Sequence, residues 1–172
     1  TNYFTVILNR NYVTPEMNEL LKCSQSLLKE KDICINYLDA NFPFIDGFPL
    51  LPHLSHNDGK KLDLSFVYQD ENNNLSNHKK SISGYGVFVE PFQEEYNQTE
   101  VCKRKGYFQY DYSKYMTFGK INSELTFSEK ETKFLIKALL ENNNLSKLFI
   151  EPHLKLRLNL SDSRIRYHGC QS

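Results

Sequence analysis

The chain has 172 residues, a length that suits one domain with a real hydrophobic core and is short for two. The charges of its 21 basic and 21 acidic residues cancel, so the sequence lacks the net positive charge typical of proteins that bind nucleic acid or an anionic membrane surface. No apolar run approaches the length of a membrane span. We therefore expect a single domain over 1–172 with no nucleic-acid partner and no transmembrane segment.

Two helices are predicted from apolar stripes that follow capping signals. For the helix near 15–30, Thr14 is a suitable N-cap and Pro15 suits the first helical position. For the helix near 129–142, Ser128 and Glu131 form a capping box, and a run of asparagines ends the helix. The stripes comprise Met17, Leu20, Leu21, Leu27 and Leu28 in the first helix and Phe134, Leu135, Ala138 and Leu139 in the second.

Short strands are expected around these helices. Tyr3–Leu8 and Ile33–Leu38 are predicted strands, and residues 39–51 are predicted to be a loop. Lys61–Tyr68 alternates, which places Leu62, Leu64 and Phe66 on one face and Asp63, Ser65 and Val67 on the other.

The second half of the chain predicts further short elements. Residues 69–80 form a polar turn with a solvated His78, and 90–106 form a long loop or insertion. Tyr107–Tyr112 is either a strand packed by its own aromatic rings or a wall that binds sugar or peptide. Residues 148–152 and 164–168 are predicted strands, whereas 154–160 suits a helix or a strand. Together the elements predict an α+β fold with a small antiparallel sheet and flanking helices.

The four cysteines form no recognisable metal or redox motif. Cys23, Cys34, Cys102 and Cys170 have no C-x-x-C spacing, which argues against a zinc finger or a redox pair. Four cysteines in a chain of this length neither require nor exclude disulfides. Cys23 falls inside the first predicted helix, where we expect a packed thiol.

The segment 52–66 holds the candidate functional residues. It contains His53 and His56, then Gly59, then Asp63 on the alternating strand. Gly59 is the expected turning point between the histidine loop and that strand. Imidazole nitrogen and carboxylate oxygen both bind zinc, at about 2 Å. The spacing suits a metal site, and it also suits a polar loop that leads into a half-buried strand.

The pattern H-x-x-H-x-x-G-x-x-x-D, from His53 to Asp63, resembles the first metal motif of the penicillin-insensitive murein endopeptidases. These belong to a group of zinc peptidases that includes lysostaphin, the D-Ala-D-Ala metallopeptidases and the hedgehog signalling domain. The resemblance implies that His56 and Asp63 are zinc ligands and that His53 is an additional, catalytic histidine. The chain departs from the family pattern at Asn57, where the family has Gln, and at Ser65, where it tends to have Asp.

The function that the resemblance implies is a zinc-dependent peptidase acting on peptidoglycan cross-link or stem peptides. It also implies a bacterial, periplasmic or envelope-associated location and a fold like that of the hedgehog and D-Ala-D-Ala peptidase domains. Two alternatives stay open. One is a module on the same fold that binds peptidoglycan or peptide without catalysis, and the other is an α+β interaction domain without metal.

We predict that the gene continues past Ser172 and encodes H-x-H, whose last histidine is the third zinc ligand in this family, within roughly fifteen residues. The 172-residue chain contains no H-x-H, and catalytic zinc normally has three protein ligands. An extended protein should bind one zinc ion, and the 172-residue form should bind it much more weakly. Binding should weaken below about pH 6, where imidazoles protonate. Equal zinc affinity of the two forms, measured by titration, would instead point to a third ligand such as His153 or His168 within this chain.

Overall fold

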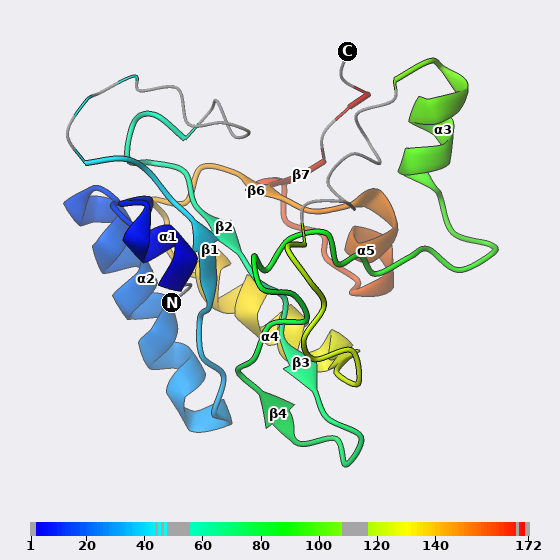
Figure 1. Cartoon of the computed structure of the whole chain (residues 1–172), viewed down its shortest axis with the longest axis horizontal. Helices are drawn as coiled ribbons and strands as arrows, with labels where there is room; N and C mark the ends of the chain where they lie inside the picture. Colours follow the sequence, from blue (N-terminus) through cyan, green and yellow to red (C-terminus); the bar gives the residue numbers. More distant parts are fainter. Residues whose placement is uncertain are drawn as a thin grey trace.

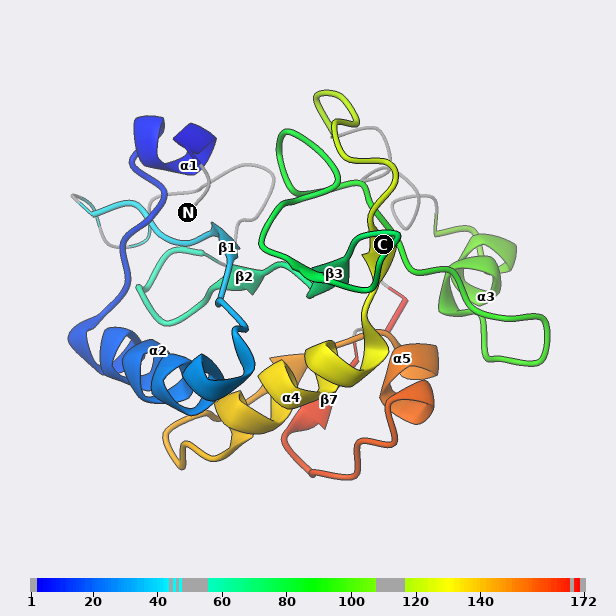
Figure 2. The same ribbon diagram turned by 90° about the horizontal axis from the view of Figure 1, so that it is seen from below.

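The computed structural model describes residues 3–43, 45, 47, 56–107, 117–167 and 169–170. Helices α2 (Pro15–Leu28) and α4 (Glu129–Leu140) lie side by side and form one layer of the molecule. Short strands run across this layer, and α1 (Tyr3–Ile7) lies on the opposite side of them from α2 (Figures 1 and 2). Helices α3 (Gln98–Arg104) and α5 (Pro152–Arg157) lie at the far end from α1 and α2.

Helix α2 begins where the sequence predicts. The Thr14 hydroxyl accepts a hydrogen bond from the Met17 amide, and Pro15 occupies the first turn. Leu20 and Leu28 are buried as expected, whereas Leu27 is 55% exposed and lies on the outer face. The expectation for Cys23 is wrong, because its side chain is exposed. Leu27 and Cys23 are exposed because the helix buries only a narrow face, which contains Leu20, Ser24 and Leu28.

Helix α4 also begins at its predicted cap. The Ser128 hydroxyl donates to the Glu131 carboxylate, while the helix ends before the asparagine run. The two long helices approach closely, since the buried Ser24 hydroxyl donates to the Ala138 carbonyl across their contact at 3.2 Å. Thr132 ties α4 to the strand layer, because its hydroxyl accepts from the Val67 amide at 3.2 Å.

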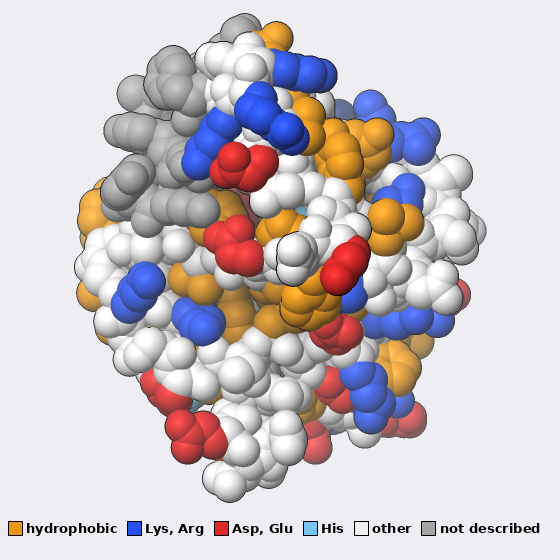
Figure 3. Space-filling view, turned by 90° about the vertical axis from the view of Figure 1, so that its right-hand side faces the viewer, with side chains coloured by type: hydrophobic (Ala, Val, Ile, Leu, Met, Phe, Trp, Pro, Cys, Tyr) orange, Lys and Arg blue, Asp and Glu red, His pale blue; other side chains and the backbone are white. Residues whose placement is uncertain are grey.

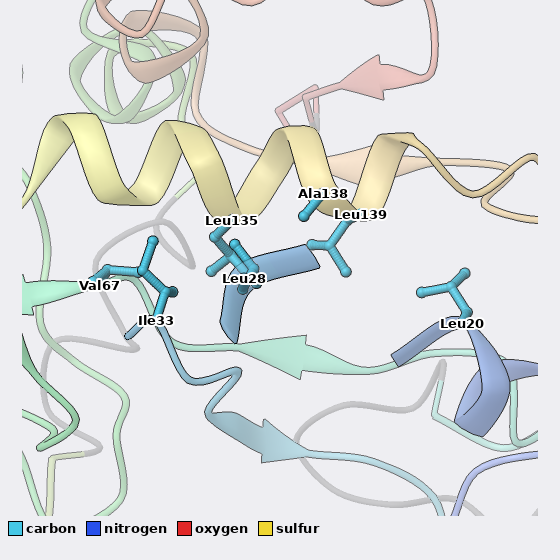
Figure 4. Packing of buried hydrophobic residues seen from close by; sticks show 7 residues of the cluster. All are labelled: Leu20, Leu28, Ile33, Val67, Leu135, Ala138 and Leu139. Carbon is cyan, nitrogen blue, oxygen red and sulfur yellow. The ribbon is translucent and has the colours of Figure 1, made fainter. Parts of the chain in front are cut away.

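The main core fills the space between α2, α4 and the strands (Figure 4). Its members are all at most 7% exposed, so each contributes nearly its full apolar surface to folding. Removing a large member such as Leu139 should therefore leave a cavity and cost about 2–5 kcal/mol. The buried residues are Leu20, Leu28, Ile33, Val67, Leu135, Ala138 and Leu139.

The strands form three small sheets. An antiparallel pair joins β1 (Tyr37–Asp39) to β2 (Asp63–Leu64). In a three-stranded antiparallel sheet, β3 (Tyr68–Gln69) lies between β4 (Leu75–Ser76) and β5 (Thr126–Phe127). The third sheet pairs β6 (Leu148–Phe149) with β7 (Ile165–Arg166) in parallel, as in Figure 1.

Three element predictions are wrong. Tyr3–Leu8 does not form a strand, because no described strand pairs with it and local bonding produces α1, which Asn9 ends in a left-handed conformation. Lys61–Tyr68 is divided into β2 and β3, because the intervening residues bond elsewhere: the Ser65 amide donates to the Asn36 carbonyl. Residues 90–106 are not only loop, since they contain α3, capped by Asn97.

The C-terminal part resolves two points that the sequence left open. Residues 154–160 begin as helix α5, and Leu154, Leu158 and Leu160 fill a second core with Ile136 and Ile165. Cys102 and Cys170 form a disulfide that joins α3 to the end of the described chain. Beside α5, hydrogen bonds from Arg157 lower the pKa of Glu95 to about 2.

The observed architecture is α+β, as predicted, with helices flanking small sheets that are mainly antiparallel. None of the helices in the described ranges is both long and apolar enough to cross a bilayer. On the face that carries α3, acidic, basic and hydrophobic side chains alternate over the surface (Figure 3), so no single charge sign dominates there.

Gly59, in the histidine loop, forms a hydrogen bond with the N-cap residue of helix α2. Its φ is +71°, and its carbonyl accepts a hydrogen bond from the Thr14 amide at 2.9 Å. A Cβ at this position would lie 2.8 Å from the Thr14 Cγ2 atom and 3.3 Å from its backbone nitrogen. The turn therefore needs a residue that has no side chain and tolerates a positive φ.

We expect Gly59→Ala to lower the free energy of unfolding by about 1–3 kcal/mol, because strain in the left-handed region adds to a clash with the helix cap. Gly47→Ala is the matched control, since Gly47 also has a positive φ, +78°, but a Cβ added there would meet no atom within 4 Å. Urea denaturation of both variants separates the two effects. Equal losses would mean that the contact with Thr14 is unimportant.

Candidate metal centre

The pairing of β1 with β2 brings two carboxylates together. Asp39 is the last residue of β1, and its partner in the antiparallel register is Asp63, the first residue of β2. The register shifts between Tyr37 and Asp39, as at a β-bulge. Bulges redirect side chains and are frequent beside functional sites. Asp39 is 2% exposed, whereas the Asp63 side chain retains 34% of its exposure.

His56 lies beside these two carboxylates. Its side chain is 6% exposed, and its Nδ1 atom is 3.2 Å from the Ala40 carbonyl oxygen. Because a carbonyl only accepts hydrogen bonds, this contact assigns a proton to Nδ1. The other ring nitrogen, Nε2, is 3.3 Å from Asp63 Oδ1. The ring therefore presents Nε2 to the partly exposed carboxylate.

Asp39 contributes the second carboxylate, and it approaches the Nδ1 edge of the same imidazole. Its Oδ2 atom is 3.8 Å from Nδ1, and both of its oxygens interact with the Arg10 guanidinium. The Arg10 Nε atom donates to Oδ1 at 2.8 Å. A buried carboxylate requires such a partner, because an isolated buried charge is very costly. The Asp39–Arg10 ion pair thus lies beside the Nδ1 edge of the His56 ring.

Tyr85 orients the exposed carboxylate. Its hydroxyl donates to Asp63 Oδ2 at 2.7 Å. Burial, together with the negative charge of Asp63, raises the pKa of this phenol well above its usual range, so it remains a donor at all physiological pH values. Two hydroxyls hold the turn that carries Tyr85: Ser81 donates to its carbonyl and Ser83 accepts from its amide.

The side chains of Asp39, His56 and Asp63 can hold a metal ion, since each offers a ligand atom and these atoms lie within 4.8 Å of one another. The separation of Nε2 and Oδ1 is compatible with two ligands of one tetrahedral metal ion. Two ligands at about 2.0–2.1 Å in a tetrahedron are separated by about 3.3–3.4 Å, and the observed separation is 3.3 Å. The Nδ1 contact with the Ala40 carbonyl is of the kind that orients histidines in metal sites.

The structure brings together His56 and Asp63, the two ligand candidates of the sequence motif, and it adds residues that the motif does not contain. His53 and His168 lie outside the described residues. The sequence predicts Asp39 in a loop, and the signal it offers for a role here is an acidic residue directly after the apolar end of a strand. Tyr85 had no signal, because nothing in its neighbourhood of glycines and serines indicates a partner 22 residues earlier in the chain.

The other described histidines do not join the site. His78 is exposed, in agreement with the prediction of a solvated side chain. His153 is 4% exposed and lies in the first turn of α5, where its Nε2 atom bonds the Val89 carbonyl at 2.8 Å. The metal-binding group that the described residues form does not include His153.

Comparisons of this chain with protein-family models, with curated proteins and with solved structures found no match. The fold is therefore described by its architecture alone, and the function has to be argued from the geometry of the Asp39, His56 and Asp63 group.

We expect Tyr85→Phe to weaken zinc binding about 10-fold or more, because it removes the hydrogen bond that orients Asp63, and outer-shell partners typically change metal affinity 10–100-fold. Tyr37→Phe is the control: Tyr37 is half-buried in β1, and its hydroxyl makes no hydrogen bond to the described residues. Competition with a chromophoric chelator measures both affinities. Equal affinities of the two variants would show that Tyr85 is only a packing residue.

Proposed function

We propose that this protein is a zinc-dependent peptidase that acts on the cross-link or stem peptides of peptidoglycan. One observation carries the proposal: the Nε2 atom of His56 and the Oδ1 atom of Asp63 are 3.3 Å apart. These are the two residues to which the resemblance assigns zinc ligation. A sequence motif alone does not require its residues to meet in space, and this geometry gives independent support.

Each residue of the centre has a distinct role under this proposal. His56 and Asp63 are the metal ligands, and Tyr85 holds the Asp63 carboxylate in one orientation. Asp39 and Arg10 support the imidazole from its Nδ1 side. We do not assign Asp39 as a ligand, because both its oxygens interact with Arg10. Catalytic zinc normally has three protein ligands, and the resemblance assigns the third to a histidine of an H-x-H motif, which the 172 residues do not contain.

Zinc held by these residues would lower the pKa of a bound water to about 7 and would polarise a carbonyl oxygen. The role of this chain would be to hold the ligand side chains rigidly and to leave one side of the metal site accessible. Burial of His56 and Asp39 provides the rigid side, and the exposed third of the Asp63 side chain provides the accessible one. His53 is the proposed catalytic histidine, which would stabilise developing negative charge or transfer a proton.

The disulfide is consistent with the proposed location outside the cytoplasm. Cys102 is fully buried and pairs with Cys170 across 68 residues of sequence. Disulfides persist in oxidising compartments such as the bacterial periplasm and are rare in the cytosol. A peptidoglycan substrate requires the same compartment.

We expect His56→Ala and Asp63→Asn each to lower zinc affinity by at least about 100-fold, because each removes a ligand. Asp39→Asn should lower it less, by about 10-fold, if Asp39 only supports the ring. His78→Ala and Asp58→Asn are matched controls, since both remove the same kinds of group at exposed positions. Zinc content after dialysis and competition with a chelator provide the measurement.

Hydrolysis of cross-linked muropeptides by the zinc-loaded protein, followed by chromatography, tests the reaction itself. Loss of cleavage in His56→Ala with retention in His78→Ala would support the peptidase. Zinc binding without cleavage would favour the module that binds peptidoglycan without catalysis. A protein that takes up no zinc would contradict the proposal.

A further inference from the structure

A cleft lies beside the turn that carries Tyr85. Its volume is about 330 Å³, at the lower end of the range for small-molecule sites. Two segments border it, residues 80–90 on either side of Tyr85 and residues 117–123, and they run side by side (Figure 2). The Ile121 amide donates a hydrogen bond to the Lys80 carbonyl, and Ser81 and Lys120 form an antiparallel β-bridge through their backbones. The described lining residues are Lys80, Gly86, Val87, Phe88, Glu90, Lys120 and Ser123.

Two ammonium groups share this cleft. Lys80 and Lys120 both line it, and neither makes a salt bridge with any described carboxylate. Elsewhere in the described chain, lysines such as Lys22, Lys61 and Lys103 pair with acidic residues three positions away. The like charges of Lys80 and Lys120 on neighbouring segments repel each other, so an anion bound in the cleft would reduce this repulsion and be stabilised there.

The charge of the lining suits a carboxylate in particular. Two lysines and Glu90 give the cleft a formal charge of +1, which one carboxylate neutralises. Phe88 is 41% exposed and offers an apolar surface beside the charges. A peptide residue that carries a carboxylate next to a hydrophobic group matches both features.

The cleft and the metal centre are linked through the adjacent residues Tyr85 and Gly86. The Tyr85 hydroxyl reaches Asp63, while Gly86, the next residue, already lines the cleft. The metal centre and the cleft therefore flank the same turn.

We propose that the cleft lined by Lys80, Lys120 and Phe88 is a subsite that binds a carboxylate of the peptide substrate. As a substrate subsite it rests on the proposed peptidase function, whereas its affinity for a carboxylate does not. The carboxylate is either the C-terminus of the peptide or an acidic side chain, and both would bind through the same two ammonium groups.

The test uses the full chain, freed of metal with a chelator, so that binding to a metal ion does not contribute. Three probes are titrated: N-acetyl-alanyl-alanine, its C-terminal amide, and N-acetyl-glutamyl-alanine amide. Amide shifts of Gly86, Val87 and Ser123 in ¹H–¹⁵N spectra report occupancy of the cleft. We expect one or both acids to shift these signals, with an affinity that falls as salt rises, and the neutral amide to leave them unchanged. The probe that binds identifies the source of the carboxylate.

Lys80→Gln and Lys120→Gln should each weaken acid binding about 5–10-fold, as expected for loss of one charged hydrogen bond. Lys120→Arg should retain binding, and Lys147→Gln, at an exposed position outside the cleft, is the matched control. Equal binding of acid and neutral amide, or no shift with either acid at millimolar concentration, overturns the subsite. Acid binding in a protein that neither takes up zinc nor cleaves muropeptides would keep the subsite and remove the peptidase.

Discussion

The site depends on the antiparallel pairing of β1 with β2. This short pairing places Asp39 opposite Asp63, and the His56 ring contacts both carboxylates. With only two or three residues per strand, the ladder contributes few hydrogen bonds of its own. Its stability comes from outside: Leu38 is buried, Leu64 packs against the main core, and the Ser65 amide extends the pairing by donating to the Asn36 carbonyl.

The charges at the centre are arranged so that each buried group has a partner. Asp39 is almost fully buried and interacts with Arg10 through both oxygens, and Asp63, which is more exposed, accepts from Tyr85. Removing one partner from such a network usually costs more than the contact itself contributes, since it leaves a buried charge uncompensated. The gradient of burial from Asp39 to Asp63 also defines which side of the imidazole a ligand can approach.

The described part of the histidine loop is attached to the scaffold at Gly59 and Lys61. Gly59 bonds the start of α2, and the side-chain amide of Asn41 donates to the Tyr12 and Lys61 carbonyls. Helix α2 is in turn held by the core that it shares with α4. The ligand residues therefore stand on loops and strand ends supported by packed helices, an arrangement in which small structural shifts are resisted by the core.

The sequence by itself determined the elements whose signals are local. Thr14 and Pro15 define the start of α2, Ser128 and Glu131 that of α4, and the H-x-x-H-x-x-G-x-x-x-D spacing points to His56 and Asp63. Only the tertiary structure decided that Tyr3–Ile7 is helical, that Lys61–Tyr68 divides into two strands, and that Asp39, Arg10 and Tyr85 surround the histidine. The reason is physical: caps and turns depend on neighbours in sequence, whereas strand partners and buried charge pairs depend on residues that folding brings together from distant parts of the chain.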